Sequence, residues 1–312
     1  MLAVALMVAM LALGISAPSR AAHAAANQTW HVTVGAESPN GVIAGMIFAP
    51  DAIYVHRGDT VVWTVGSMEP HTVSFGAPPP FSGPPSLEDL IKLFATPAGG
   101  SSFTGASYYN SGLLTTVPEA SGFPFAAQQY SLAINAPVGT YMFYCLVHGQ
   151  TMSQVVHVIA DDAAYPFTQA NYDAQAAQQR AHVIAQGWSA FAQTNANLPD
   201  HTVSVGQRVD AGMADVMRFV RGNTTIKVGE TVTFVNTTTA PHTVTIGKEL
   251  GFGQYGDLNN VRLGDNVNTG IFGPAFGGVT SMTLRFTQPG VYTFYCELHD
   301  FMGMVATITV TP

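Results

Sequence analysis

The sequence contains few charged residues and only two cysteines. Charged residues make up 10% of its 312 residues, and 11 Lys and Arg stand against 19 Asp and Glu, which gives a net charge of −8. No basic cluster interrupts this pattern, so nucleic-acid binding is not expected. The two cysteines, Cys145 and Cys296, are too few for the disulfide framework that holds many small secreted domains together.

Apolar residues, glycine and proline are abundant instead. Hydrophobic residues make up 47% of the chain, which also contains 31 Gly and 19 Pro. Few charges combined with many turn-forming residues favour β-sandwiches joined by turns. The length is sufficient for two ordinary domains, so we predict an all-β protein of two domains.

The first 26 residues resemble an export signal. An apolar run over residues 1–15 is followed by the small residues of segment 22–26, which offer an A-x-A cleavage site. The run is short for a bilayer span, so cleavage is favoured over an uncleaved N-terminal anchor, the only membrane contact that we expect. The mature protein is therefore predicted to be periplasmic, or otherwise extracytoplasmic or secreted.

The chain contains an internal repeat. Residues 32–76 align without a gap with residues 203–247, at an offset of 171. Residues 139–148 match residues 290–299 at an offset of 151, so the first copy carries 20 extra residues before its cysteine. Two copies of one fold are therefore expected.

The repeat sets the expected domain boundaries. We call residues 27–160 the first repeat and residues 200–312 the second repeat, with a linker over 161–199. The extra residues of the first repeat lie within an insertion over 77–108. The net charge is −5 in the first repeat, with two basic and seven acidic residues, and −2 in the second, with seven and nine.

Potential metal ligands are concentrated near the end of the second repeat. A short segment holds the thiol of Cys296, the imidazole of His299 and the thioethers of Met302 and Met304. A thiolate and a neutral imidazole bind copper or zinc well, whereas a thioether is soft and favours copper. An upstream imidazole, that of His242, would complete a trigonal site of two histidines and one cysteine.

The first repeat holds the same pattern in His71, Cys145 and His148. Because each cysteine lies in its own copy of the pattern, metal binding is favoured over a disulfide between them. The fourth ligand of this set is open: Met152 follows His148 by four residues, and Gln154 stands where the second repeat has its last methionine if one residue is inserted.

These motifs resemble the cupredoxins, the plastocyanin/azurin/pseudoazurin family of blue copper proteins. The resemblance implies two tandem Greek-key β-sandwiches, each with a type 1 copper held by an upstream His, a Cys-x-x-His loop and an axial Met. Met304 is then axial in the second repeat, and Met302 is a packing residue. The ligands implied by the resemblance, with Gln154 as the competitor of Met152, are His71, Cys145, His148, Met152, His242, Cys296, His299 and Met304.

The resemblance implies electron transfer as the function. Catalytic members of the wider family add further copper centres through His-x-His pairs and through histidines beside the cysteine. This chain has no His-x-His pair, and Tyr144 and Tyr295 precede its cysteines. We therefore expect an electron carrier and not an enzyme. Copper storage, delivery or resistance without a redox role is the alternative.

The expected docking surface surrounds the histidine ligands. Leu146, Val147 and Leu298 flank them and would leave an exposed imidazole edge in an apolar patch, the usual exit for electrons in this family. Acidic residues near both sites, Glu69 among them, favour a basic partner or are simply solvated. The expected partner is a redox protein such as a cytochrome or a copper-containing oxidase or reductase.

Strands and helices are also predicted. In the first repeat, β-rich segments indicate strands at 30–34, 52–56, 60–65 and 72–75, and Ser86 can cap a short helix at 87–94. In the second repeat, strands are expected at 291–295 and 305–310 on either side of the ligand loop. The linker is predicted to form a helix that packs on a domain through one apolar stripe. Its members are Ala177, Ala181, Ile184, Trp188 and Phe191.

Overall fold

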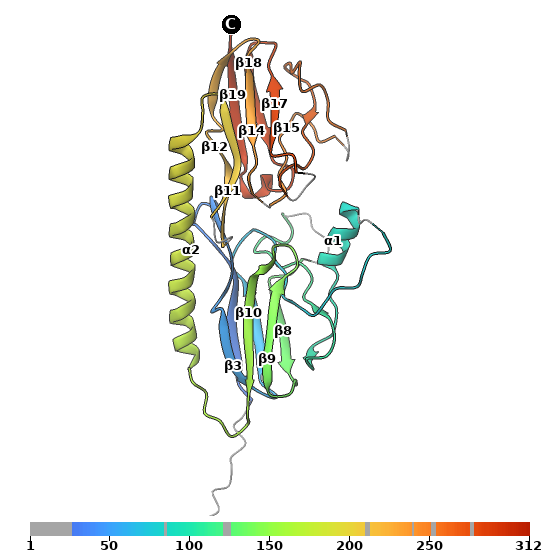
Figure 1. Ribbon diagram of the computed structural model, residues 1–312, viewed down its shortest axis with the longest axis vertical. Helices are drawn as coiled ribbons and strands as arrows, with labels where there is room; N and C mark the ends of the chain where they lie inside the picture. The colour runs from blue at the N-terminus through green and yellow to red at the C-terminus, as the bar shows by residue number, and fades with distance from the viewer. Residues whose placement is uncertain are drawn as a thin grey trace, which may run out of the picture.

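The computed structural model describes residues 27–83, 86–120, 126–209, 213–238, 240–250, 254–274 and 278–312. The predicted signal peptide, residues 1–26, lies outside the described residues. Two β-sandwiches lie end to end, and one long helix runs beside both (Figure 1). Within the described ranges, no helix is long and apolar enough to span a membrane.

The first repeat forms a sandwich of two sheets. One face contains strands in the order β2-β1-β4-β8-β6, and the other contains β3-β10-β9-β5-β7. The elements are β1 (Thr29–Glu37), β2 (Ile43–Ala49), β3 (Ala52–His56), β4 (Thr60–Val65), β5 (Ser74–Phe75), α1 (Leu87–Ala95), β6 (Ser102–Phe103), β7 (Tyr109–Asn110), β8 (Gln129–Ile134), β9 (Gly139–Cys145) and β10 (Gly149–Ile159). The predicted strands at 52–56 and 60–65 are confirmed, whereas β2 was not predicted.

The second repeat forms an equivalent sandwich. Its sheets have the orders β17-β14-β11-β12 and β13-β19-β18-β15-β16. The elements are β11 (Thr202–Arg208), β12 (Ala214–Val220), β13 (Thr224–Lys227), β14 (Thr231–Val235), β15 (Thr245–Ile246), β16 (Val267–Asn268), β17 (Ser281–Arg285), β18 (Gly290–Tyr295), the 3-10 turn η1 (Asp300–Met302) and β19 (Val305–Thr311). The fold class is therefore all-β, as the sequence predicts.

Each sandwich has its own apolar core. In β4, the side chains of Val61, Trp63 and Val65 are buried, while the alternate residues are half-buried. This period of two is the signature of a strand with one face against the core. Trp63 also finds a buried partner, since its indole N–H donates to Oε1 of Gln154 at 2.7 Å. Burying a valine side chain such as that of Val61 contributes roughly 1.5–3 kcal/mol.

One sheet continues from the first repeat into the second. Strand β2 pairs antiparallel with its own equivalent, β12, which produces a nine-stranded sheet across both repeats. Ala44 lies opposite Asp215, and these two positions differ by the repeat offset of 171. The junction therefore has the geometry of an isologous two-fold dimer interface within a single chain.

The linker helix α2 (Gln169–Asn197) fastens this junction. Thr168 caps its first turn, its side chain accepting a hydrogen bond from the backbone N–H of Asn171. The helix packs on β1 and β2 of the first repeat and on β11 and β12 of the second (Figure 1). It ends at Leu198, which precedes Pro199 and has the extended backbone that proline imposes on its predecessor.

The predicted apolar stripe of α2 is confirmed in part, and the predicted packing is correct. The buried face consists of Tyr172, Ala176, Val183 and Gly187. Of the predicted members, Ile184 and Phe191 are partly buried and pack against the junction core, whereas Ala177, Ala181 and Trp188 are exposed. Near Ile43 the helix lies so close to β2 that a glycine, and not a large apolar residue, occupies the contact. A Cβ atom on Gly187 would collide with the side chain of Ile43.

Helix α1, from the insertion, lies at the junction of the two repeats (Figure 1). Ser86 and Asp89 form a reciprocal capping box, which explains why the helix begins after a proline-rich segment. Ile91 and Phe94 point to a cavity that Pro241 and Leu298 of the second repeat also line. The helix itself was predicted, but its position beside a cavity shared with the second repeat was not.

Candidate metal centres

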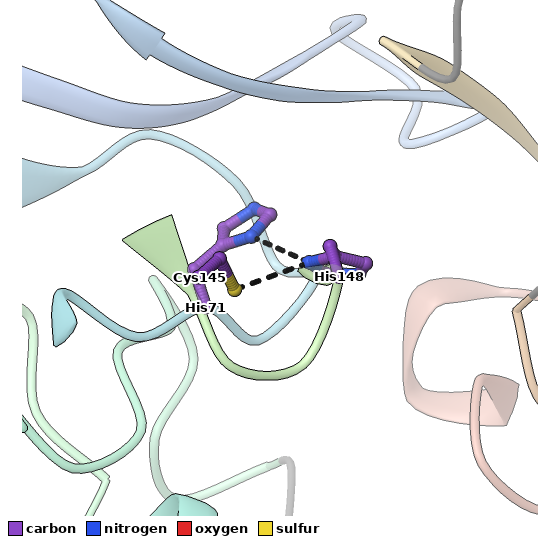
Figure 2. Close-up of side chains that lie close together, drawn as sticks. All are labelled: His71, Cys145 and His148. Carbon is purple, nitrogen blue, oxygen red and sulfur yellow. Dashed lines mark hydrogen bonds between the residues drawn. The ribbon is translucent and has the colours of Figure 1, made fainter. Parts of the chain in front are cut away.

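The structure brings the three predicted imidazole and thiol groups of the first repeat together. His71 precedes β5, Cys145 ends β9, and His148 lies in the turn before β10 (Figure 2). Nδ1 of His148 lies 3.4 Å from Sγ of Cys145 and 3.1 Å from Nδ1 of His71. All three donor atoms lie within 4.8 Å of one another, which is the spacing that one metal ion can bridge.

The second repeat repeats this arrangement with His242, Cys296 and His299. Sγ of Cys296 lies 3.3 Å from Nδ1 of His299 and 3.8 Å from Nδ1 of His242. His299 begins the 3-10 turn η1, which replaces the plain turn of the first repeat. The predicted strands on either side of this loop are confirmed as β18 and β19.

Backbone amides hold both sulfur atoms in place. The N–H of Thr72 donates to Sγ of Cys145 at 3.3 Å, and the N–H of Thr243 donates to Sγ of Cys296 at 3.4 Å. Both threonines directly follow the upstream histidine of their set. This contact favours a thiolate, because a thiolate accepts hydrogen bonds better than a thiol.

The charges of the neighbouring histidines also favour thiolates. Burial raises the pKa of Cys145, but the charge and hydrogen bond of His148 outweigh it and leave this pKa well below its ordinary value. Burial lowers the pKa of His148, whereas the Cys145 thiolate and Glu69 raise it to about 10. In the second repeat, burial raises the pKa of Cys296. The charge of His299 outweighs this effect, so the pKa of Cys296 is also well below its usual range. In each set the cysteine and the histidine of the Cys-x-x-His turn thus stabilise each other's charged form.

A glycine makes room for each upstream imidazole. Gly35 and Gly206 occupy equivalent positions, at a β-bulge in β1 and in β11, with φ of 76° and 77°. A Cβ atom would lie 2.5 Å from Nε2 of His71 at the first and 2.8 Å from Nε2 of His242 at the second. Both the left-handed backbone and the close approach require glycine.

The two methionines predicted as fourth ligands are both buried. Met152 and Met304 are buried in the same clusters as Cys145 and Cys296, respectively. Met152 lies in a bulge of β10, where the pairing with β9 jumps from Gly149, opposite Cys145, to Ser153, opposite Tyr144.

Gln154, the competing candidate in the first repeat, is engaged elsewhere. Its Oε1 accepts the Trp63 indole N–H, and its Nε2 donates to the carbonyl of Pro50 at 2.7 Å. Met302 packs into the core cluster of the first repeat, across the junction from its own sandwich.

Glu69 connects the two sites. Its Oε1 lies 3.1 Å from Nε2 of His148, and its Oε2 lies 3.6 Å from Nε2 of His299 in the other repeat. The side chain of Glu69 is 4% exposed. Burial raises its pKa, but the hydrogen bond from His148 and the charges of the surrounding histidines lower this pKa to about 2.

The expectation that Glu69 is solvated or faces a docking partner is therefore wrong. The sequence did contain a hint, because the equivalent position in the second repeat is Ala240. An acid present in only one copy of a repeated loop is not part of the ligand pattern that the two repeats have in common. The repeat alignment shows this asymmetry, but it does not show which groups the acid contacts.

The expected exposed imidazole edge is also absent from both sites. The side chains of His148 and His299 are 5% and 4% exposed, because the two repeats face each other at this point. Val147 and Leu298 line a cavity of about 90 Å³ between the repeats, closed on one side by α1. The flanking apolar residues are thus part of an internal contact and not of an open docking patch.

The remaining described histidines lie outside the two sets. His56 is buried, with Nε2 3.0 Å from the carbonyl oxygen of Ala163, and His157 stacks on Tyr54. His31, His182 and His201 are exposed. None of these five belongs to either His-Cys-His set.

The chain is similar in sequence to known copper proteins. A family model described as copper binding proteins of the plastocyanin/azurin family matches residues 205–311. Plastocyanin A'/A'' of Nicotiana tabacum is 35% identical over 102 residues, covering 32% of this chain and 91% of the relative. The chloroplastic plastocyanin of Chlamydomonas reinhardtii is 35% identical over 135 residues, covering 43% and 83%.

Similar solved structures include two cupredoxins. A mutant plastocyanin of fern is 25% identical, with a TM-score of 0.25, and the match covers 35% of this chain and 99% of that one. A purple cupredoxin from Nitrosopumilus maritimus is 21% identical, with a TM-score of 0.24, and the match covers 36% and 100%.

Fold and sites together define a tandem β-sandwich protein with two His-Cys-His clusters. The chain belongs to the plastocyanin/azurin family of copper-binding proteins. Copper binding and electron transfer are the general functions that this membership supports.

Proposed function

We propose that this protein is an electron carrier with two mononuclear type 1 copper centres. The first would be held by His71, Cys145, His148 and Met152. The second would be held by His242, Cys296, His299 and Met304. The observation that supports this most strongly is the convergence of two Nδ1 atoms and one Sγ in each repeat, with a backbone N–H on each sulfur.

The donor set fits copper better than a harder metal ion. A thiolate with two imidazoles suits both Cu(I) and Cu(II), and a thioether adds a soft axial ligand. Copper, when bound, supplies a one-electron couple. The protein would orient the sulfur ligands through its own fold, because Cys145 and Cys296 are fully buried and each accepts a backbone N–H.

The surroundings support electron transfer and not catalysis on a substrate. The three imidazole and thiol groups of each set lie against buried side chains, and the cavity beside His299 is small and apolar. The chain has no His-x-His pair that could hold further copper ions. We therefore infer that single electrons move between this protein and a redox partner such as a cytochrome or a copper-containing oxidase or reductase.

The proposal includes a domain organisation. Residues 27–160 and 200–312 would be the two cupredoxin domains, joined by the helical linker 161–199, with residues 1–26 as a cleaved signal. This places the protein in the periplasm or another extracytoplasmic compartment. The separate apolar core of each sandwich supports the two-domain division.

Copper quantification together with a visible spectrum tests the proposal. The purified oxidised protein should hold two copper ions per chain and show the intense blue band of a Cys–Cu bond. Cys145→Ser and Cys296→Ser should each remove one copper and about half of the band, since each breaks one of two similar sites. One copper that is lost completely with a single substitution, or copper without a blue band, would contradict the proposal.

A further inference from the structure

The two metal centres face each other across the junction, and one buried carboxylate lies between them. Nε2 of His148 and Nε2 of His299 point to the same side chain, that of Glu69, at 3.1 Å and 3.6 Å from its two oxygens. An imidazole that binds metal through Nδ1 carries its proton on Nε2. The N–H of His148 then donates a charge-assisted hydrogen bond to Oε1 of Glu69, while the N–H of His299 faces Oε2 at ion-pair distance. Oε2 has no hydrogen-bond partner among the described residues, so His299 is the group that faces its charge.

The rigidity of the junction makes this contact a built feature. The repeats are joined by the β2–β12 pairing, by α2 along both sandwiches and by Arg218, whose guanidinium donates to the carbonyls of Asn40 and Gly41 at 2.8 and 3.1 Å. None of these contacts involves Glu69. The carboxylate is therefore held between the imidazoles by a scaffold that does not need it.

The bridge is asymmetric although the junction is pseudo-symmetric. Because Ala240 occupies the equivalent position, Glu69 of the first repeat serves the histidines of both repeats. The second repeat contributes no carboxylate at this position. A single acid on both imidazoles instead makes the two centres share one charge and one contact path.

Building on the proposed function, we propose that Glu69 couples the two copper centres into one unit, and that electrons pass between them inside the chain through His148, Glu69 and His299. In this step one electron leaves Cu(I) in one ligand set and reduces Cu(II) in the other. No proton or bond is exchanged, and the total charge of the protein is unchanged.

The first test compares midpoint potentials in Glu69→Gln with those in Glu297→Gln. Glu297 is a matched acid that accepts hydrogen bonds from Thr245 and Asn268 within the second repeat only. Removing the shared charge should raise both potentials, because a nearby negative charge stabilises Cu(II). Glu297→Gln should raise the second potential alone. A rise confined to the first centre in Glu69→Gln would overturn the proposal.

The second test follows the electron itself. Oxidised wild-type protein is mixed with less than one equivalent of reductant, and rapid freeze-quench electron paramagnetic resonance distinguishes the two centres. Redistribution between them should occur at a rate independent of protein concentration, and this phase should be lost in Glu69→Ala. A rate proportional to protein concentration, or an unchanged rate in Glu69→Ala, would overturn the coupling.

Metal-free protein provides a separate readout. By nuclear magnetic resonance, the Nε2 protons of His148 and His299 should exchange slowly with water in wild type and quickly for both residues in Glu69→Ala. Unchanged exchange at His299 would show that the bridge does not form. Failure of the proposed function looks different, because wild-type protein would then lack two blue copper ions while these protons remained protected.

Discussion

At the scale of single residues, the two bulge glycines are the least replaceable positions around the sites. In Gly35→Ala, the new Cβ would lie 2.5 Å from Nε2 of His71, so the imidazole must move. The left-handed backbone adds roughly 1–2 kcal/mol of strain. We predict less copper in the first centre, an intact second centre, and lower stability in urea unfolding of the metal-free protein.

Gly100→Ala is the matched control for this substitution. Its φ of 74° is nearly the same, but nothing lies within 4 Å of its new Cβ. It should therefore show the backbone strain without loss of copper. Equal copper contents in the two variants would contradict the steric role of Gly35.

Glu37 provides a pH-dependent contribution to stability. Burial raises its pKa above the unfolded value of 4.5, more than the hydrogen bond from the Met68 N–H lowers it. A raised carboxyl pKa means that the folded state binds the proton more tightly, so the contribution of Glu37 to stability is largest below pH 4.5 and falls as the pH rises through the folded pKa.

Glu37→Gln should remove this dependence. We predict that the variant gains stability relative to wild type at pH 7 and that the difference narrows toward pH 4. Urea unfolding of the metal-free proteins at both pH values measures it. Glu119→Gln, at an exposed position, is the control for the loss of one carboxylate. A difference for Glu37→Gln that widens toward low pH would contradict the sign.

At the scale of elements, helix α2 depends on small residues where it crosses the sheet. Alanine normally stabilises a helix interior by up to about 1 kcal/mol relative to glycine. At Gly187, however, the added Cβ would collide with the Ile43 side chain. We predict that Gly187→Ala destabilises the protein by about 1–3 kcal/mol through overpacking.

A double-mutant cycle with Ile43→Ala separates the two effects. Ile43→Ala removes the atom that Gly187→Ala would strike, so the second substitution should become neutral or stabilising in that background. Thermal unfolding of the four proteins gives the coupling. Additive effects would show that α2 adjusts its position and that the close contact is not required.

At the scale of the whole molecule, the two centres are predicted to have different potentials, with the first centre lower. The first repeat carries the larger negative charge, −5 against −2, and Glu69 lies nearer to His148 than to His299. Both features favour Cu(II) in the first centre. An electron should therefore rest on the second centre.

Redox titration of the two single-site variants measures this order. Cys296→Ser reports the first centre alone, and Cys145→Ser reports the second. Coincident values, or a higher value for the first centre, would refute the order. Met152→Leu should change the spectrum of the first centre if its thioether is axial, while Gln154→Leu, which loses the contact with Trp63, should mainly lower stability.

The sequence by itself determined the fold class, the repeat and both His-Cys-His sets. These depend on local patterns: a Cys-x-x-His turn, a glycine at a fixed position in a strand, and alternation of apolar residues. Each of these patterns acts over a few neighbouring residues, and each occurs once in both repeats. For this reason the predicted strands 52–56 and 60–65, and the capped helix after Ser86, agree with the structure.

Only the tertiary structure decided how the two copies meet. The pairing of β2 with β12 joins positions separated by about one repeat, and no local pattern marks an edge strand that will find its own equivalent. The buried face of α2 was assigned partly to the wrong residues. The distance between the helix and the sheet, and not the size of a side chain, decides which residues are buried there. Glu69 could be seen as an extra acid, but its position between His148 and His299 follows from long-range packing that the sequence does not display.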